Sequence, residues 1–387
     1  MLAPPASVNE ATARADEIAR DVLAPMASRT DQGVWPVEGI AALKEAGLAG
    51  LVVPREHGGA GLGLRAVAGV CESLGLACAS TALCFGMHLV ATAVLAAKAT
   101  PRQTELYLEP IAAGEHLTTL ALSETGTGSQ FWLPQTKLTT TGDGWRVEGQ
   151  KSFVTNGGQA DSYVVSTMAA DPDAPLGEFS CVIVPVGSQG LRFTGQWEGV
   201  GMRGNSSLTA ELEGVEVDAD HLLGAPGDQI WYVFEMVAPN FLTAMAGVYL
   251  GVAQASLEEA TAHLSARRHS HSGRSLASEP VLQHRIGGLW AEVQATRRLV
   301  YWAAEEAEVG GPEALPALAA AKATAGDTAV AVANEAMTLL GGMGYRDRSP
   351  VERHLRDARA AHVMSPTTDI LRTWTGRAVL GLPLLGT

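Results

Sequence analysis

Two runs near the middle of the chain decide the fold: Ala121-Leu122-Ser123-Glu124-Thr125-Gly126-Thr127-Gly128-Ser129-Gln130, and farther along Gly149-Gln150-Lys151-Ser152-Phe153-Val154-Thr155-Asn156-Gly157-Gly158. The first run sets two glycines among small hydroxyl residues, so its backbone can approach a flat or phosphorylated ligand closely. The second run continues an alternating strand into an aromatic residue, a hydroxyl residue and an Asn-Gly turn. Either run alone is most simply a tight turn. Together, between short strands, they predict a ligand-binding loop.

Composition predicts a soluble globular protein with a large core. The chain has 387 residues, of which 47% are apolar, and this length suits two or three structural units. Its 27 basic and 41 acidic residues give a net charge of −14, which argues against nucleic acid or an anionic membrane as the main partner. We find no signal peptide and no uninterrupted apolar stretch of membrane-spanning length, so we expect a cytoplasmic protein.

The four cysteines show no Cys-X-X-Cys pair and no zinc spacing, which predicts free buried thiols in a reducing compartment. His269 and His271 lie in a polar loop without a third ligand, so we predict no metal site there.

Hydrophobic patterning predicts an α+β protein with three domains. Residues 1–117 have helical periodicity, and the first helix, from Val8 to Ala24, is expected to end at Pro25. Residues 118–226 contain short alternating runs separated by Gly, Asp, Asn and Pro, which predict a small barrel or a pair of sheets. Residues 227–387 return to long apolar helical runs, as in a helical bundle.

The helix, β, helix order and the paired central runs resemble the acyl-CoA dehydrogenase family over essentially the whole chain. The stretches 339–345 and 351–359 support this resemblance, which implies an N-terminal helical domain, a central β domain and a C-terminal four-helix bundle. It also implies FAD as cofactor and a homo-oligomer, either a tetramer or a dimer. The residues expected to contact FAD are Leu122, Ser123, Ser129, Phe153, Thr155 and Thr367, with Gly341 and Gly342 approaching the FAD of a neighbouring subunit and Arg267 or Arg268 binding its phosphates.

The catalytic base of this family has no counterpart at the usual position. Oxidation of an acyl thioester at Cα and Cβ needs a base for the α proton while flavin accepts the β hydride. The family usually supplies a Glu, and this chain has Ser365 there, whose hydroxyl cannot act as that base unaided. Among the remaining candidates we single out Asp369 and His362; the others are Glu235 and His88. Each is more often a cap, surface or core residue.

Three functions stay open at this point. The first is an FAD-dependent oxidoreductase that oxidises an acyl thioester, carried by CoA or by a carrier protein, and passes its electrons to an electron-transfer partner. The second is a flavin-dependent monooxygenase on the same fold, supplied by a partner reductase, which needs no such carboxylate; residues 280–289 loosely resemble those enzymes. The third is a catalytically silent flavoprotein.

Overall fold

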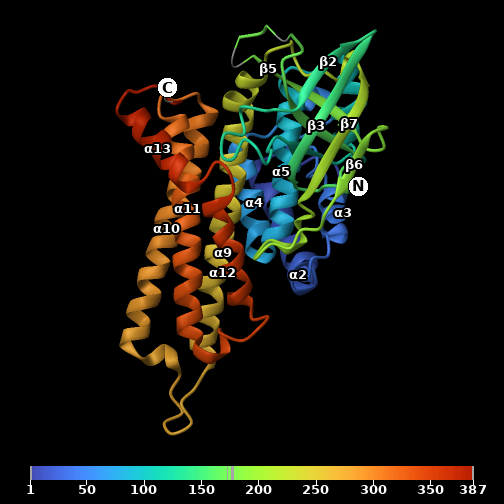
Figure 1. The fold of residues 1–387 in the computed structure, drawn as a ribbon. Helices are drawn as coiled ribbons and strands as arrows, with labels where there is room; N and C mark the ends of the chain where they lie inside the picture. Colours follow the sequence, from blue (N-terminus) through green and yellow to red (C-terminus); the bar gives the residue numbers. More distant parts are fainter. Residues whose placement is uncertain (1, 172, 176–177, 386–387) are drawn as a thin grey trace.

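The N-terminal part of the chain is helical. The computed structural model describes residues 2–171, 173–175 and 178–385, and Figure 1 shows the chain coloured along its sequence. Small and apolar side chains on nearly every face explain why the helices of residues 64–97 are buried almost throughout. The elements of this part are α1 (Val8–Ile18), η1 (Ala19–Leu23), α2 (Ala24–Thr30), α3 (Val37–Glu45), η2 (Arg55–His57), α4 (Leu64–Ala77), α5 (Ala79–Ala97), α6 (Pro101–Gln103), η3 (Thr104–Leu108) and α7 (Glu109–Ala112).

The prediction that Pro25 ends the first helix is wrong. The helical backbone continues through Pro25 to Thr30, because the π-helical segment η1 directly precedes α2. A wide π turn relieves the clash and the missing amide that a proline brings to a regular helix. The same arrangement recurs where η3 precedes Pro110 and where a third π segment precedes Pro239.

The central part contains two sheets, so of the two predicted alternatives the pair of sheets is correct. A three-stranded sheet has the order β1-β4-β5, and its strands are almost continuously buried, as their apolar runs require. A four-stranded antiparallel sheet has the order β2-β3-β7-β6, and its inner strand β7 alternates between buried and more exposed residues over most of its length. The strands are β1 (Thr118–Ala121), β2 (Lys137–Thr141), β3 (Gly144–Val154), β4 (Ser162–Met168), β5 (Phe179–Pro185), β6 (Leu191–Thr194) and β7 (Leu208–Asp218).

The C-terminal part is a bundle of long helices (Figure 1). Glycines bring its first long helix against α4, since a Cβ on Gly251 would collide with the backbone of Glu72. The elements are α8 (Gln229–Trp231), η6 (Tyr232–Val237), α9 (Ala238–Ala266), η7 (Leu276–Ser278), α10 (Pro280–Glu308), α11 (Ala314–Leu340), η8 (Gly341–Met343), α12 (Pro350–Val363) and α13 (Thr368–Val379).

Within the described residues, two helical stretches are long and apolar enough to cross a membrane, contrary to the expectation from the sequence. They are 79–97 and 229–266, and 89% of the apolar window of each is buried inside the fold. They are core helices of the structure. All four cysteines are buried and free, as predicted.

Arg356 and Asp357 join the three parts of the chain. Arg356 donates to both carboxylate oxygens of Asp31, at 2.9 and 2.6 Å, and also pairs with Glu352. Asp357 is buried and accepts a hydrogen bond of 2.5 Å from the Met202 amide in the β domain. The pair therefore holds α12 against both other domains.

Candidate functional site

A cavity of about 70 Å³ lies where the β domain, α5, the start of α9 and the loop before α13 meet. Both central sequence runs contribute to it, the first through Leu122 and Ser123 and the second through Phe153. The loop before α13 adds Ser365. The full lining is Met87, Leu120, Ala121, Leu122, Ser123, Phe131, Ser152, Phe153, Val154, Val237, Ala238, Phe241, Ser365 and Pro366.

Hydrogen bonds hold the two central runs together. The Ser152 amide donates to the Ser123 carbonyl at 2.9 Å, and the hydroxyls of Thr125 and Ser152 lie 2.8 Å apart. The two runs are far apart in sequence but form one continuous surface, at the end of β1 and the end of β3.

A buried ion pair between Glu124 and Lys151 supports this surface from behind. Lys151 Nζ lies 2.5 Å from Glu124 Oε1 and also donates to Ser166 Oγ at 2.8 Å. The Glu124 carboxylate accepts further bonds from the Gln135 amide and from the amide and hydroxyl of Thr136. Both carboxylate oxygens of Glu124 thus have hydrogen-bond partners, as a buried charge requires. Sequence reasoning missed this pair; its one signal was a lysine at an inward position of an alternating strand.

Both members of the pair are charged at neutral pH. Burial lowers the pKa of Lys151 to about 8, which is still above neutrality. Burial raises the pKa of Glu124, but the nearby Lys151 and the hydrogen bonds outweigh this effect and hold the pKa below its ordinary value.

The surface in front of the pair suits a flat aromatic ligand. Phe153 has a left-handed backbone (φ 60°), and 67% of the residue is exposed beside the edge of the Trp197 ring, at a centroid distance of 6.0 Å. A Cβ on Gly128 (φ 53°) would meet nothing within 4 Å, so a ligand can approach the backbone there. Exposed apolar rings are unfavourable in water. The exposed ring of Phe153, which the resemblance assigned to the isoalloxazine ring of FAD, and the open backbone at Gly128 therefore suit such a ring.

Two other predicted FAD contacts of this region are engaged with protein partners. Thr155 is buried, with its hydroxyl 3.2 Å from that of Ser207. Thr367 is the N-cap of α13, and its hydroxyl accepts from the Ile370 amide at 3.5 Å. Ser129 belongs to the first run, and its carbonyl accepts a hydrogen bond of 3.2 Å from the Ser365 hydroxyl.

Ser365 is the only one of the predicted catalytic residues that lines the cavity. Asp369 is exposed on the first turn of α13. His362 pairs through Nε2 with Asp327 Oδ1 at 3.0 Å, and Asp327 also binds Arg372. The polar side chains on the described cavity wall are the hydroxyls of Ser123, Ser152 and Ser365, with no carboxylate or imidazole among them.

Lys322 on α11 fixes the position of the Ser365 loop. It is fully buried, and its Nζ donates to the carbonyls of Ala361 at 2.7 Å, Met364 at 3.3 Å and Pro366 at 3.0 Å. Burial lowers the pKa of Lys322 to about 7. Three acceptors match the three N–H groups of an ammonium ion. Sequence reasoning missed this residue too, because nothing in the apolar periodicity of α11 identifies the partner of a buried lysine.

The remaining predicted FAD contacts lie at the opposite end of the bundle. Gly341, Gly342 and Arg267 are exposed where α11 and α9 end, whereas the Ser365 loop is held by Lys322. A helix rises 1.5 Å per residue, so η8 lies roughly 27 Å from the level of Lys322 along α11. One chain does not bring these residues to its own cavity.

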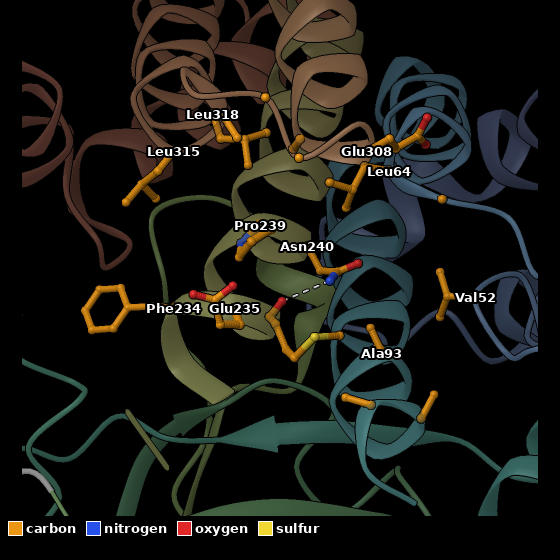
Figure 2. Close-up of a pocket in the computed structure, with 18 of the residues that line it drawn as sticks. Val52, Leu64, Ala93, Phe234, Glu235, Pro239, Asn240, Glu308, Leu315 and Leu318 are labelled. Atoms are coloured by element: carbon orange, nitrogen blue, oxygen red, sulfur yellow. Dashed lines mark hydrogen bonds between the residues drawn. The ribbon is translucent and has the colours of Figure 1, made fainter. Parts of the chain in front are cut away.

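The two other base candidates are also outside the cavity. His88 is buried in the core, where its Nε2 donates to the Ala49 carbonyl at 3.0 Å and its Nδ1 accepts from the Thr118 amide at 3.1 Å. Burial lowers the pKa of His88 to about 4. Glu235 lines a separate pocket of about 570 Å³ beside Pro239 and Asn240 (Figure 2).

Comparisons with known proteins agree with this architecture. Models of the N-terminal, middle and C-terminal domains of acyl-CoA dehydrogenases match residues 8–115, 119–215 and 239–380. The cyclohex-1-ene-1-carbonyl-CoA dehydrogenase of Geobacter metallireducens is 32% identical over 369 residues, which cover 94% of this chain and 95% of the relative. A probable acyl-CoA dehydrogenase of Bacillus subtilis is 30% identical over 94% of this chain and 95% of its own length.

Solved structures share the fold. The butyryl-CoA dehydrogenase of Megasphaera elsdenii superposes with a TM-score of 0.90 at 26% identity, covering 96% of this chain and 98% of that chain. A chain in the structure of the electron transferring flavoprotein of Acidaminococcus fermentans gives a TM-score of 0.91 at 29% identity, with 96% and 97% coverage. The predicted fold is confirmed, and the chain belongs to the acyl-CoA dehydrogenase family, whose members are FAD-dependent oxidoreductases that act on acyl-CoA thioesters.

Proposed function

We propose that this protein binds FAD and oxidises an acyl thioester between Cα and Cβ. One observation carries the proposal: a single cavity unites Leu122 and Ser123, the exposed ring of Phe153, and the Ser365 loop of the C-terminal bundle. When bound, FAD supplies the hydride acceptor of this reaction. A thioester that enters the cavity is therefore held between the flavin-binding surface and the start of α9.

The residues of this chain position the two reactants. The Glu124–Lys151 pair fixes the surface for the flavin ring, and Lys322 fixes the loop that faces it. The mostly apolar wall excludes water, which strengthens every electrostatic interaction inside the site. Gly341, Gly342 and Arg267 would serve the FAD of a neighbouring subunit in a dimer or tetramer, since they lie far from the cavity of their own chain.

The α proton has no carboxylate acceptor on the described cavity wall. We therefore propose that proton removal is the weak step of this enzyme. Asp369 and His362 are poor candidates for the base, since the first is exposed outside the cavity and the second is held by Asp327. In the cell, a cytoplasmic electron-transfer flavoprotein or a reductase would exchange electrons with the bound flavin.

The test is a visible spectrum of the purified protein, followed by anaerobic titration with acyl-CoA thioesters. The proposal predicts bound FAD whose absorbance is bleached by at least one thioester. A protein that holds no FAD after reconstitution would refute the proposal.

A second function, a catalytically silent flavoprotein, is favoured by the hydroxyl-only polar lining of the cavity. It predicts tightly bound FAD that no thioester bleaches. A flavin-dependent monooxygenase would instead lose its flavin on purification and consume oxygen when reduced flavin is added. The same purified protein distinguishes these alternatives.

A further inference from the structure

A short loop of the β domain lies between α12 and the second central run. This loop, residues 200–207, contains the 3₁₀ turn η4 (Arg203–Asn205). Met202 before the turn and Ser206 after it have left-handed backbone conformations, with φ of 49° and 51°. Such a conformation is unfavourable for residues other than glycine, so it persists only where neighbouring contacts hold it. The neighbours of the loop therefore determine its shape.

One side of the loop rests on α12. Asp357 Oδ1 accepts a hydrogen bond of 2.5 Å from the Met202 amide, and both residues are buried. Arg356 donates to the Val200 carbonyl at 3.0 Å. A Cβ on Gly201 would collide with the Arg356 carbonyl, so the two backbones are in direct contact. Burial raises the pKa of Asp357 to about 6, which leaves its carboxyl mostly ionised at neutral pH, and a charged acceptor makes the stronger hydrogen bond.

The other side of the loop holds the second run. The Asn156 amide donates to the Asn205 carbonyl at 3.0 Å. The Gly157 amide donates to the Ser206 carbonyl at 2.9 Å, and the Ser206 hydroxyl donates back to the Gly157 carbonyl at 2.9 Å. Asn156 has a left-handed backbone itself (φ 61°) and lies three residues after Phe153. The backbone that presents Phe153 thus depends on where the loop lies.

From these contacts we infer that Asp357 is a positioning residue for the flavin, because it fixes the second run, and with it Phe153, through the 200–207 loop. The inference rests on the proposed binding of FAD at this run. The helix that carries Asp357 also leads directly into the Ser365 loop. One helix therefore supports both the flavin surface and the loop that faces it across the cavity.

The first measurement is FAD affinity, from the quenching of flavin fluorescence when FAD is titrated with the flavin-free protein. Asp357→Leu removes the acceptor of the Met202 amide and is expected to weaken FAD binding about tenfold or more. Asp357→Asn keeps a side-chain oxygen that can accept this bond and should stay within about threefold of wild type.

Gly201→Ala disturbs the same contact from the side of the loop, without changing a charge, and should also weaken FAD binding. Because both substitutions act on one contact, Asp357→Leu combined with Gly201→Ala should lose less affinity than the product of the two single losses. Gly201→Ala alone carries the test where Asp357→Leu does not fold.

The second measurement needs no flavin. Hydrogen exchange of the Asn156 and Gly157 amides, which are bonded to the loop, should be faster in Asp357→Leu than in the wild-type protein. The Ser152 amide donates to the Ser123 carbonyl instead and should keep its wild-type rate.

A matched control is Glu72→Leu, which breaks a comparable network between helices. Glu72 accepts hydrogen bonds from Arg297 at 2.9 Å and from the Tyr301 hydroxyl at 2.8 Å. We expect this variant to be less stable than wild type but to bind FAD with wild-type affinity and to keep the wild-type exchange of Asn156 and Gly157.

A folded Asp357→Leu variant with wild-type FAD affinity would overturn the inference, as would wild-type exchange of both amides in that variant. An equal loss of FAD affinity in Glu72→Leu or in Asp357→Asn would also overturn it. Failure of the proposed function looks different: thioesters then leave the flavin oxidised while the variants keep the expected order of FAD affinity. In a wild-type protein that binds no FAD the proposed function fails, and the exchange of Asn156 and Gly157 alone decides whether Asp357 fixes the run.

Discussion

Replacing Lys151 with Met tests whether the buried ion pair organises the flavin-binding surface. The substitution leaves Glu124 charged and buried, with its hydrogen bonds from Gln135 and Thr136 but without its cation. Removing one partner of a buried pair costs about 3–5 kcal/mol. Because Glu124 lies inside the first run, the local distortion falls on the residues that hold FAD.

We therefore expect Lys151→Met to lower the free energy of unfolding by about 3–5 kcal/mol and to weaken FAD binding at least tenfold. Urea denaturation followed by tryptophan fluorescence measures the first quantity, and flavin fluorescence quenching measures the second. The control is Lys137→Met, on the exposed side of the neighbouring strand β2, which should change the unfolding free energy by less than about 0.5 kcal/mol.

The double variant Glu124→Gln with Lys151→Met separates charge from packing. It removes both charges, so we expect it to recover a large part of the stability that the single variant loses. An unfolding free energy of Lys151→Met within about 1 kcal/mol of wild type, or a double variant less stable than the sum of both single changes, would refute the reasoning.

Three further predictions concern His88, Ser365 and Lys322. Burial lowers the pKa of His88 from its ordinary 6.5 to about 4. Between pH 6.5 and pH 4 only the unfolded chain therefore binds this proton, and the free energy of unfolding falls by about 3 kcal/mol. His88→Gln should remove this part of the pH dependence of the unfolding free energy measured in urea, and a variant with the wild-type pH dependence would contradict the prediction. Ser365→Glu places a carboxylate in the cavity and should speed flavin reduction by an acyl-CoA about 10²–10⁴-fold, whereas Ser365→Gln should not. Equal rates for the two variants would show that residue 365 does not occupy the position of the family's catalytic base. Lys322→Met frees three carbonyls and should speed hydrogen exchange of the amides of Met364, Ser365 and Thr367, with protection unchanged in the first central run. Wild-type protection of these three amides would show that the lysine does not hold the loop.

Periodicity and motif spacing predicted most of the fold. Local hydrophobic patterns predict the helix, β, helix order, the pair of sheets and the long helices of the bundle. These patterns record which face of each element is buried, and this does not depend on distant contacts. Pro25 broke the pattern because a π turn before it accommodates the proline, and proline two residues after a π segment recurs at Pro110 and Pro239.

The candidate site was predictable only in part. The two central runs were identified as one ligand surface, and the structure joins them through Ser152 and Ser123. The supports of the site were not identified, because Glu124–Lys151 and the three carbonyls on Lys322 are partnerships between residues far apart in sequence. The sequence also could not rank Asp369 and His362, whose distance from the cavity depends on how α12 and α13 pack.

The most direct test of the proposed oxidation is the anaerobic reaction of the FAD-loaded protein with butyryl-CoA, followed through the visible absorbance of flavin. We expect bleaching of the bound FAD together with formation of the α,β-unsaturated thioester. Flavin that stays oxidised with butyryl-CoA and with every other short acyl thioester, in a protein whose Ser365→Glu variant is equally inert, would contradict it.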